Sequence, residues 1–279
     1  MGVARPTTLD AALAALDEHP DADLLAGGTD LMVDVNFGRR RPRQVVALRR
    51  VAELRAHHVD DGVLELGAGV TYTDLETALA EEVPALAAAA RTVGSPQIRN
   101  AGTVGGNLGT ASPAGDALPY LFAADAEVVL AGVDGQRSVP VDAFITGPKQ
   151  TDRRPGEVIR CVRMPRIRGP QAFCKIGTRN AMVISVAALA LICDVDARRV
   201  RTAMGAVGPR PVRPRDAEEM VSAAIDWDAL TVPDDALEAF GAACAAAATP
   251  IDDHRSTSEY RRHAVDVLAR RALRRSLAQ

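Results

Sequence analysis

Glycine is concentrated in one stretch of this chain, and this clustering limits what the backbone there can form. Residues 94–116 hold six of the 22 glycines found in 279 residues, together with Pro96 and Pro113. Helices and strands disfavour such a composition, and a long loop in a compact domain is usually functional or disordered. The segment carries little charge, which argues against disorder. We therefore expect residues 94–116 to be an irregular, functional loop.

Two double-glycine turns are the strongest indication of a binding site. The first is Gly27-Gly28, directly after the apolar run Leu24-Leu25-Ala26, and the second is Gly105-Gly106 within the glycine-rich segment. Without Cβ atoms, successive backbone N–H groups can approach an anion closely. One such turn alone is more often a tight connection than a phosphate site. Two turns facing one another would supply four or more donors, enough for a diphosphate.

The two common nucleotide-binding patterns are absent. Gly67-Ala68-Gly69 continues to Tyr72 where a dinucleotide fingerprint needs a third glycine, and no phosphate-binding loop ending in Gly-Lys-Ser/Thr occurs. The formal net charge is −3, from 36 acidic and 33 basic residues. This balance gives no reason to expect nucleic acid or an anionic membrane as a partner. Capture of an anion would depend on local amide groups.

Cysteines and apolar runs limit the class of protein further. Cys161, Cys174, Cys193 and Cys244 are scattered without a C-x-x-C pair, so we expect buried, unreactive thiols and neither an iron–sulfur cluster nor a metal site. No stretch has the roughly 18 consecutive apolar residues of a membrane span. The first residues lack the apolar region of a secretory signal. These features predict a cytoplasmic protein.

Periodicity and turn signals predict an α+β chain. We expect a βαβ-like unit from a helix beginning near Leu9 and strands 24–26 and 45–48, and then a strand at 63–66. Thr73 is expected to cap a helix through Ala80. Further elements follow at 84–93 and 117–123 (helices) and at 127–130, 138–141 and 158–162 (strands). After a linker at 166–170 we expect an antiparallel meander of strands 172–176, 183–193 and 201–207, with helices at 217–224, 234–247 and 258–277.

Several short motifs together resemble one family. They are LLAGGTDL (24–31), IRNAGTVGGN (98–107), NLGTASPAGDALP (107–119), GPKQT (147–151), GEVI (156–159), FCKIGTR (173–179) and PIDDHRSTSEYRRH (250–263). This set resembles the FAD-binding subunits of molybdenum hydroxylases, the group of xanthine dehydrogenase, aldehyde oxidase and carbon monoxide dehydrogenase. The resemblance covers essentially the whole chain, and the combination of AGGTDL with GTVGGN…ASPAGD is specific.

The resemblance implies both fold and domain organisation. A two-part FAD-binding domain of the vanillyl-alcohol-oxidase (PCMH) type would occupy residues 1–167, with subdomains at about 1–55 and 56–167. A smaller α+β domain like the C-terminal domain of the carbon monoxide dehydrogenase flavoprotein would occupy residues 168–279. Its core would be a three-stranded antiparallel sheet with helices.

The resemblance also implies roles for individual residues. The two turns would embrace the FAD diphosphate, Val93 and Ile159 would line the cofactor, Asp116 would bind a cofactor sugar hydroxyl, and Lys175 would lie near the isoalloxazine ring. The implied cofactor-binding residues are Leu24, Leu25, Ala26, Gly27, Gly28, Thr29, Asp30, Leu31, Val93, Thr103, Val104, Gly105, Gly106, Asn107, Asp116, Ile159 and Lys175. Taken as residues alone, Asp116 equally suits an N-cap for the following helix and Lys175 a solvated lysine. No catalytic acid, base or nucleophile is identifiable.

The function implied is that of an electron-transfer subunit. FAD in this chain would take electrons from [2Fe–2S] clusters of a small partner subunit, while a large subunit oxidises substrate at a molybdenum cofactor. NAD+ would be the acceptor in a xanthine dehydrogenase-like hetero-oligomer. The alternatives are the flavin subunit of a carbon monoxide dehydrogenase or aldehyde oxidase, a flavin-free scaffold subunit of the same fold, or a stand-alone FAD oxidoreductase. Many relatives carry an acidic residue where this chain has Asn180 to Ile184, a departure that bears on the electron acceptor.

Charged clusters are expected to be solvated. His57-His58, the run Arg39-Arg40-Arg41 and the stripe of arginines from Arg261 to Arg275 are predicted to face solvent. The second possibility for the run at Arg39 is docking to an acidic partner subunit, and for the stripe an intersubunit face.

Overall fold

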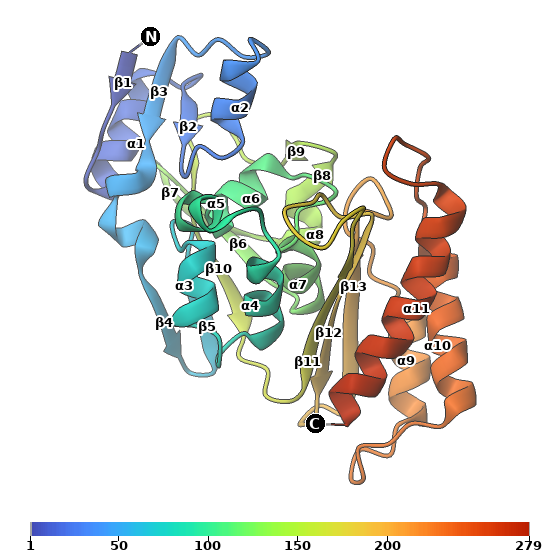
Figure 1. Cartoon of the computed structure of the whole chain (residues 1–279). Helices are drawn as coiled ribbons and strands as arrows, with labels where there is room; N and C mark the ends of the chain where they lie inside the picture. The colour runs from blue at the N-terminus through green and yellow to red at the C-terminus, as the bar shows by residue number, and fades with distance from the viewer. Residues whose placement is uncertain (1, 279) are drawn as a thin grey trace. The chain divides into compact units, whose positions relative to one another are not determined.

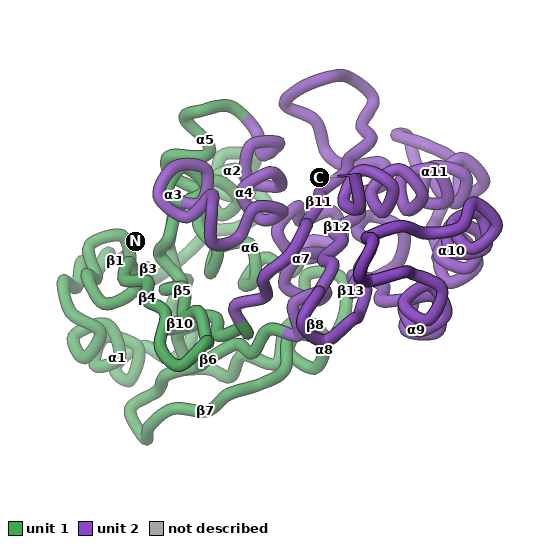
Figure 2. The backbone as a smooth tube through the Cα atoms, turned by 90° about the horizontal axis from the view of Figure 1, so that it is seen from below, with its two compact units in different colours: residues 1–74, 95–111, 126–165 green, residues 75–94, 112–125, 166–279 purple. Residues whose placement is uncertain are grey.

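The computed structural model describes residues 2–278, and their backbone forms two compact units (Figure 2). Unit 1 comprises the chain up to Asp74 with residues 95–111 and 126–165, and unit 2 comprises residues 75–94, 112–125 and the chain from Arg166 onward. The units interleave along the chain, whereas the domains expected from the sequence follow one another. The division at 167/168 remains our proposal for the domain organisation.

Unit 1 begins with a small, wholly parallel sheet in the order β1-β3-β2. Its strands are β1 (Gly2–Ala4), β2 (Asp23–Leu25) and β3 (Gln44–Ala47). Helix α1 (Leu9–Glu18) begins where Thr8 Oγ1 accepts a hydrogen bond from Ala11 N–H at 3.2 Å, and it buries Leu13 and Leu16 in a core shared with Val46. Helix α2 (Leu31–Asn36) connects β2 to β3. The predicted βαβ arrangement is confirmed, and β1 adds an edge that was not predicted.

The second sheet of unit 1 has five antiparallel strands in the order β4-β5-β10-β6-β7 (Figure 1). They are β4 (His57–Asp60), β5 (Val63–Gly67), β6 (Glu127–Gly132), β7 (Gly135–Pro140) and β10 (Val158–Pro165). β10 lies at the centre, is the longest of these strands and buries five of its eight residues, as a strand flanked on both edges requires. His57 and His58 are exposed, which confirms the prediction that they are solvated.

Short elements complete this part of the chain. They are the 3₁₀ turns η1 (Leu48–Arg50) and η2 (Ala52–Arg55), helices α3 (Tyr72–Thr77) and α8 (Val141–Phe144), and strands β8 (Ile145–Gly147) and β9 (Gln150–Thr151). The predicted cap at Thr73 is wrong. The helix begins at Tyr72, and Asp74 N–H donates to Thr71 Oγ1 at 3.1 Å.

The glycine-rich segment is not an irregular loop, so that prediction is wrong. It contains α5 (Pro96–Ala101) and α6 (Val104–Thr110). Each helix starts at a hydroxyl cap: Ser95 Oγ accepts from Ile98 N–H, and Thr103 Oγ1 accepts from Gly106 N–H. Pro96 occupies the first turn, where its missing N–H costs nothing. The capping signals outweighed the low helix propensity of glycine.

Unit 2 is built on the antiparallel sheet β11-β12-β13, which confirms the predicted three-stranded meander. Its strands are β11 (Gln171–Ile176), β12 (Ala187–Asp194) and β13 (Arg199–Gly205). One face is covered by α9 (Arg215–Ala224) and α11 (Ser258–Leu277), and α10 (Asp234–Ala247) packs against these two helices (Figure 1). The other face is covered by α4 (Pro84–Arg91) and α7 (Leu118–Ala123). With both faces covered, all eight residues of β12 are buried, which explains why the first seven, before Asp194, are all apolar.

Arg261 corrects the prediction of a solvated arginine stripe on α11. Arg261 is only 2% exposed. Its guanidinium donates to Val186 O at 2.7 Å, Ala206 O at 2.8 Å and Asp253 Oδ1 at 2.7 Å. Arg262, Arg271, Arg274 and Arg275 are exposed as predicted. Among residues 2–278, no helix combines the length and apolar character needed to cross a bilayer.

Candidate cofactor site

The first double-glycine turn presents unused backbone donors. Gly28 has φ +75°, a left-handed conformation that glycine adopts without strain. Among the described residues, none accepts a hydrogen bond from the N–H groups of residues 27–31, whereas the next amide, Met32 N–H, donates to Gly28 O at 3.1 Å. All five residues are at least partly exposed. A run of consecutive free amides is suited to binding an anion.

The second turn differs, because its amides are already occupied. Gly105 N–H donates to Ala68 O at 2.8 Å, Gly106 N–H to Thr103 Oγ1 at 3.0 Å and Asn107 N–H to Thr103 O at 3.0 Å. A Cβ at Gly105 would lie 2.5 Å from Ala68 Cβ. Gly105 therefore allows α6 to pack closely against the β5–α3 connection. The expectation that both turns present free donors holds only for the first.

The structure brings the two turns together within unit 1. A Cβ at Gly27 would lie 1.8 Å from Ala101 O, and one at Gly106 would lie 3.9 Å from Ala26 Cβ. The bridge between Thr71 and Thr103 holds the start of α6 in place. Segments about 75 positions apart in the sequence thus form one surface, and only glycine fits at its closest point.

Two further predicted residues lie on the same unit. Asn107 follows the second glycine pair on α6, and its Oδ1 is buried without a hydrogen-bond partner among the described residues. A buried polar atom of this kind usually has a partner, often water or a ligand. Ile159, on β10, is 6% exposed, and its Cδ1 would lie 3.8 Å from a Cβ at Gly109. Leu24 and Leu25 belong to β2, and Leu31 begins α2.

The remaining predicted residues belong to unit 2, where Asp116 and Lys175 form an ion pair. Lys175 Nζ lies 2.6 Å from Asp116 Oδ2, with side-chain exposures of 8% and 9%. The strand register puts Lys175 opposite Ala188, on the face of the sheet that α4 and α7 cover. Ser185 Oγ donates to Asp116 Oδ1 at 2.6 Å, and Thr92 O lies 3.4 Å from Lys175 Nζ. Two buried opposite charges are thus paired and further hydrogen-bonded.

This arrangement overturns both alternative explanations taken from the sequence. Asp116 is not an N-cap, since α7 has its cap position at Ala117 and no side-chain capping bond. Lys175 is not solvated. Sequence reasoning missed Ser185 and Thr92, because no local pattern marks a hydroxyl that completes a buried ion pair. Val93 directly follows the last turn of α4 and is partly buried.

Comparison with known proteins assigns the family. Residues 1–167 match the model of the FAD binding domain in molybdopterin dehydrogenase, and residues 172–276 match that of the CO dehydrogenase flavoprotein C-terminal domain. The chain belongs to the FAD-binding subunits of the molybdenum hydroxylases. The relatives of this flavoprotein subunit are named as dehydrogenase subunits, so it is an oxidoreductase component.

Relatives match the flavoprotein subunit over most of its length. It is 30% identical to the xanthine dehydrogenase FAD-binding subunit of Escherichia coli O157:H7, over 98% of this chain and 95% of that one. It is 35% identical to the nicotinate dehydrogenase FAD-subunit of Eubacterium barkeri, over 77% of each chain. Its structure is similar to a chain of the carbon monoxide dehydrogenase from Hydrogenophaga pseudoflava, with a TM-score of 0.87, 26% identity and coverage of 100% and 97%. The predicted family and the α+β fold with a two-part FAD-binding domain are confirmed.

The residues present fit the FAD that the family binds. The free amides at 27–31 suit a diphosphate, the close contact of Gly27 with Ala101 O places them beside the second turn, and Asn107 offers an unused polar atom. Residues 180–184, where the resemblance leads us to expect an acidic residue, include the exposed side chains of Met182 and Ile184. The Arg179 side chain donates from Nε to Ala181 O at 3.1 Å and so ties down the backbone of this loop.

Proposed function

We propose that this flavoprotein subunit holds FAD through the diphosphate at Gly27–Leu31 and transfers electrons from [2Fe–2S] clusters of a small partner subunit to NAD+. A large subunit with a molybdenum cofactor would oxidise the substrate, as in xanthine dehydrogenase. The observation that carries this proposal is the run of unused N–H groups beside the second glycine turn. When bound, FAD accepts electrons singly and donates them as a pair, which suits exchange between clusters and a nicotinamide.

The proposal assigns parts to the predicted cofactor-binding residues. The N–H groups of residues 27–31 would donate to diphosphate oxygens. They would supply the attraction for an anion that a chain with a net charge of −3 does not provide as a whole. Thr103 to Asn107 would form the opposing wall, with the Asn107 carboxamide as its polar contact. Ile159 would supply an apolar contact, as would Val93. Asp116 would accept from a cofactor hydroxyl, and Lys175 would contribute positive charge near the flavin ring, as the resemblance implies.

The diphosphate contact is tested by comparing flavins that differ in that group. The purified, flavin-free chain is titrated with FAD, FMN and riboflavin, with binding followed by flavin fluorescence. We expect FAD to bind at least about a hundredfold more tightly than riboflavin, because several charge-assisted hydrogen bonds act together. ADP should compete with FAD. Equal affinity for all three flavins would contradict a role for the turn, and failure to bind FAD at all would support the flavin-free scaffold.

The acceptor is tested separately from the cofactor. The FAD-loaded complex, with its partner subunits, is mixed with NADH without oxygen. Bleaching of the visible flavin band indicates exchange with nicotinamide. If the flavin is reduced by substrate but not by NADH, another acceptor is at work and the NAD+ part of the proposal fails.

The xanthine dehydrogenase assignment rests on similarity to relatives of that name, at 30% identity over nearly the whole chain. We also place the complex in a reducing compartment such as the cytoplasm, since the four cysteines are free thiols. Burial raises the pKa of both Cys161 and Cys193 to about 12, which keeps these thiols protonated and unreactive. The carbon monoxide dehydrogenase or aldehyde oxidase alternatives are distinguished by assaying the purified complex with each substrate.

A further inference from the structure

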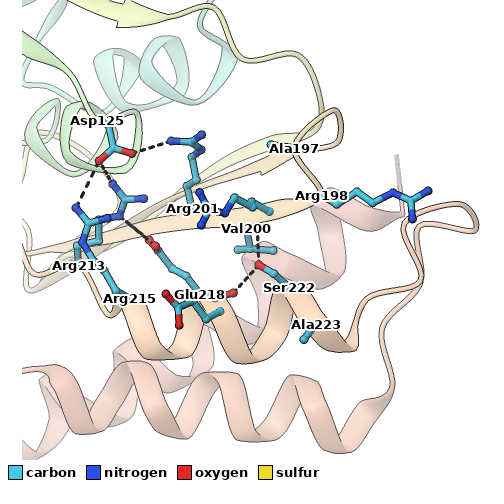
Figure 3. Close-up of a pocket in the computed structure, with 12 residues that line it drawn as sticks. Asp125, Ala197, Arg198, Val200, Arg201, Arg213, Arg215, Glu218, Ser222 and Ala223 are labelled. Carbon is cyan, nitrogen blue, oxygen red and sulfur yellow. Dashed lines mark hydrogen bonds and ion pairs between the residues drawn. The ribbon is translucent and has the colours of Figure 1, made fainter.

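A second concave site lies entirely within unit 2, and arginine dominates its lining (Figure 3). The cavity, of about 340 Å³, lies beside the β12–β13 turn, the first residues of β13 and the start of α9. Its charged lining consists of five arginines and three carboxylates. The arginines are Arg198, Arg199, Arg201, Arg213 and Arg215. None of them is among the residues proposed to hold FAD.

Three of these guanidinium groups converge on one carboxylate. Asp125, after the last turn of α7, has φ +50° and a side chain that is 43% exposed. Arg201 lies 2.7 Å from it, Arg213 forms a closer ion pair, and Arg215 lies 3.5 Å away. Figure 3 shows all three pointing to the same place. Arg201 and Arg213 each have a second carboxylate partner, whereas Asp125 is the one carboxylate among the described residues within ion-pair distance of Arg215, so Arg215 is the least neutralised of the three.

The inner arginines are held rigidly. Arg213 also contacts Glu218 at 2.8 Å, and Glu218 in turn accepts from Thr202 N–H at 2.7 Å. Arg201 also pairs with Asp194 at 3.0 Å. Side-chain exposures of 10% for Arg213 and 16% for Arg201 show that these groups are largely buried. Their orientation is therefore set before any ligand arrives.

The arginines at the rim of the cavity are available to bind a ligand, because their ion pairs are weak or absent among the described residues. Arg199 is exposed, and no described carboxylate lies within ion-pair distance of it, while Arg215 has only the 3.5 Å contact with Asp125. Arg198 pairs with Asp228 at the surface, a contact of little strength. Glu219, also exposed, adds an opposing charge to the lining.

We propose that this cavity binds the phosphate groups of a small molecule. Arg199 and Arg215 contact the phosphate, and Arg201 and Arg213, which their carboxylate partners hold in place, form the wall beneath it. Guanidinium groups match phosphate oxygens in geometry and charge, and the two rim arginines can each contact phosphate oxygens of one ligand. The volume is in the range of small-molecule sites. Free phosphate and the phosphate of a nucleotide share this chemistry.

The test uses the full chain saturated with FAD, so that the proposed flavin site is already filled. Inorganic phosphate, pyrophosphate and ADP are titrated by calorimetry. Trp227, the only tryptophan in the chain, donates from Nε1 to Ser222 O at 2.9 Å beside the cavity and serves as a fluorescence reporter. Equal binding of pyrophosphate and ADP indicates free phosphates as the ligand class. Much tighter binding of ADP indicates a nucleotide.

Charge variants make the proposal falsifiable. Arg199→Gln and Arg215→Gln should each weaken binding about tenfold, the effect of one charge-assisted contact. Glu219→Gln should strengthen it. Arg262→Gln, on an exposed arginine of α11, is the matched control and should change affinity less than about twofold. The proposal fails if none of the three phosphates binds saturably, or if Arg262→Gln weakens binding as much as Arg215→Gln.

Discussion

Gly27 and Ala101 lie so close that a Cβ atom on the glycine would sit 1.8 Å from the alanine's carbonyl oxygen. This contact joins the turn after β2 to the last residue of α5, two residues before the cap of α6. The free amides of the first turn therefore have a fixed position relative to the second glycine pair. The proposed diphosphate site depends on this junction.

Gly27→Ala should disrupt the junction. The atoms that the added Cβ would meet belong to the backbone and not to a flexible side chain. The backbone must therefore shift, at a cost of about 2 kcal/mol for an overpacked site. We expect a lower free energy of unfolding in urea and at least about tenfold weaker FAD binding. Gly109→Ala is the control, because its Cβ would meet only Ile159 Cδ1 at 3.8 Å on an exposed turn of α6. It should leave stability unchanged or raise it slightly, and equal losses in the two variants would contradict the argument.

Lys175→Met should destabilise unit 2. It leaves the Asp116 carboxylate buried without its cation, which costs about 3 kcal/mol or more. The double variant Asp116→Asn/Lys175→Met removes both charges and should recover most of that loss. Urea unfolding of the flavin-free chain measures both. A double variant no more stable than Lys175→Met would show that the ion pair does not account for the burial of these residues.

The same substitution should lower the midpoint potential of bound FAD. A positive charge near the ring favours the anionic reduced flavin, and methionine removes that charge while keeping the length of the side chain. Spectroelectrochemical titration gives the potential. Lys149→Met is the matched control, since Lys149 is the only other lysine and is exposed. An unchanged potential in Lys175→Met rules out the role near the ring.

Asp253 should make stability depend on pH. Burial opposes its ionisation, but hydrogen bonds from Arg255 and Arg261 outweigh burial and hold its pKa well below the usual value. A lowered folded-state pKa stabilises the protein above the unfolded pKa, near 4, and this stabilisation is lost as the pH falls toward the folded pKa. Asp253→Asn should therefore cost about 2 kcal/mol at pH 7, because it leaves the buried Arg261 with a weaker partner.

Below about pH 4 the gap between wild type and Asp253→Asn should narrow, because protonation removes the same charge. Urea titrations across this range test the sign, with the exposed Asp17→Asn as a control. A gap that widens on acidification would contradict the assignment.

Much of the fold was predictable where one local signal sufficed. Helix α10 has its predicted bounds of Asp234–Ala247, and α11 begins at Ser258 as expected, after a Thr257 cap. Both depend on apolar spacing and turn residues, which act over a few positions. The composition of the glycine-rich segment does not reveal its two helices, which depend on the caps at Ser95 and Thr103. The motifs indicated the family, since several fixed strings in one order are far more specific than any single turn.

The sequence by itself determined many of the helices and strands, the family and the presence of two glycine turns. Only the tertiary structure decided which backbone N–H groups are hydrogen-bonded and which charged side chains are buried. It showed that Gly105 N–H donates to Ala68 O while the amides at 27–31 remain free. It also showed that Lys175 and Arg261 are buried beside carboxylates. The reason is physical: helix and strand formation follow from neighbouring residues, whereas burial and pairing of a polar group depend on what distant segments bring against it.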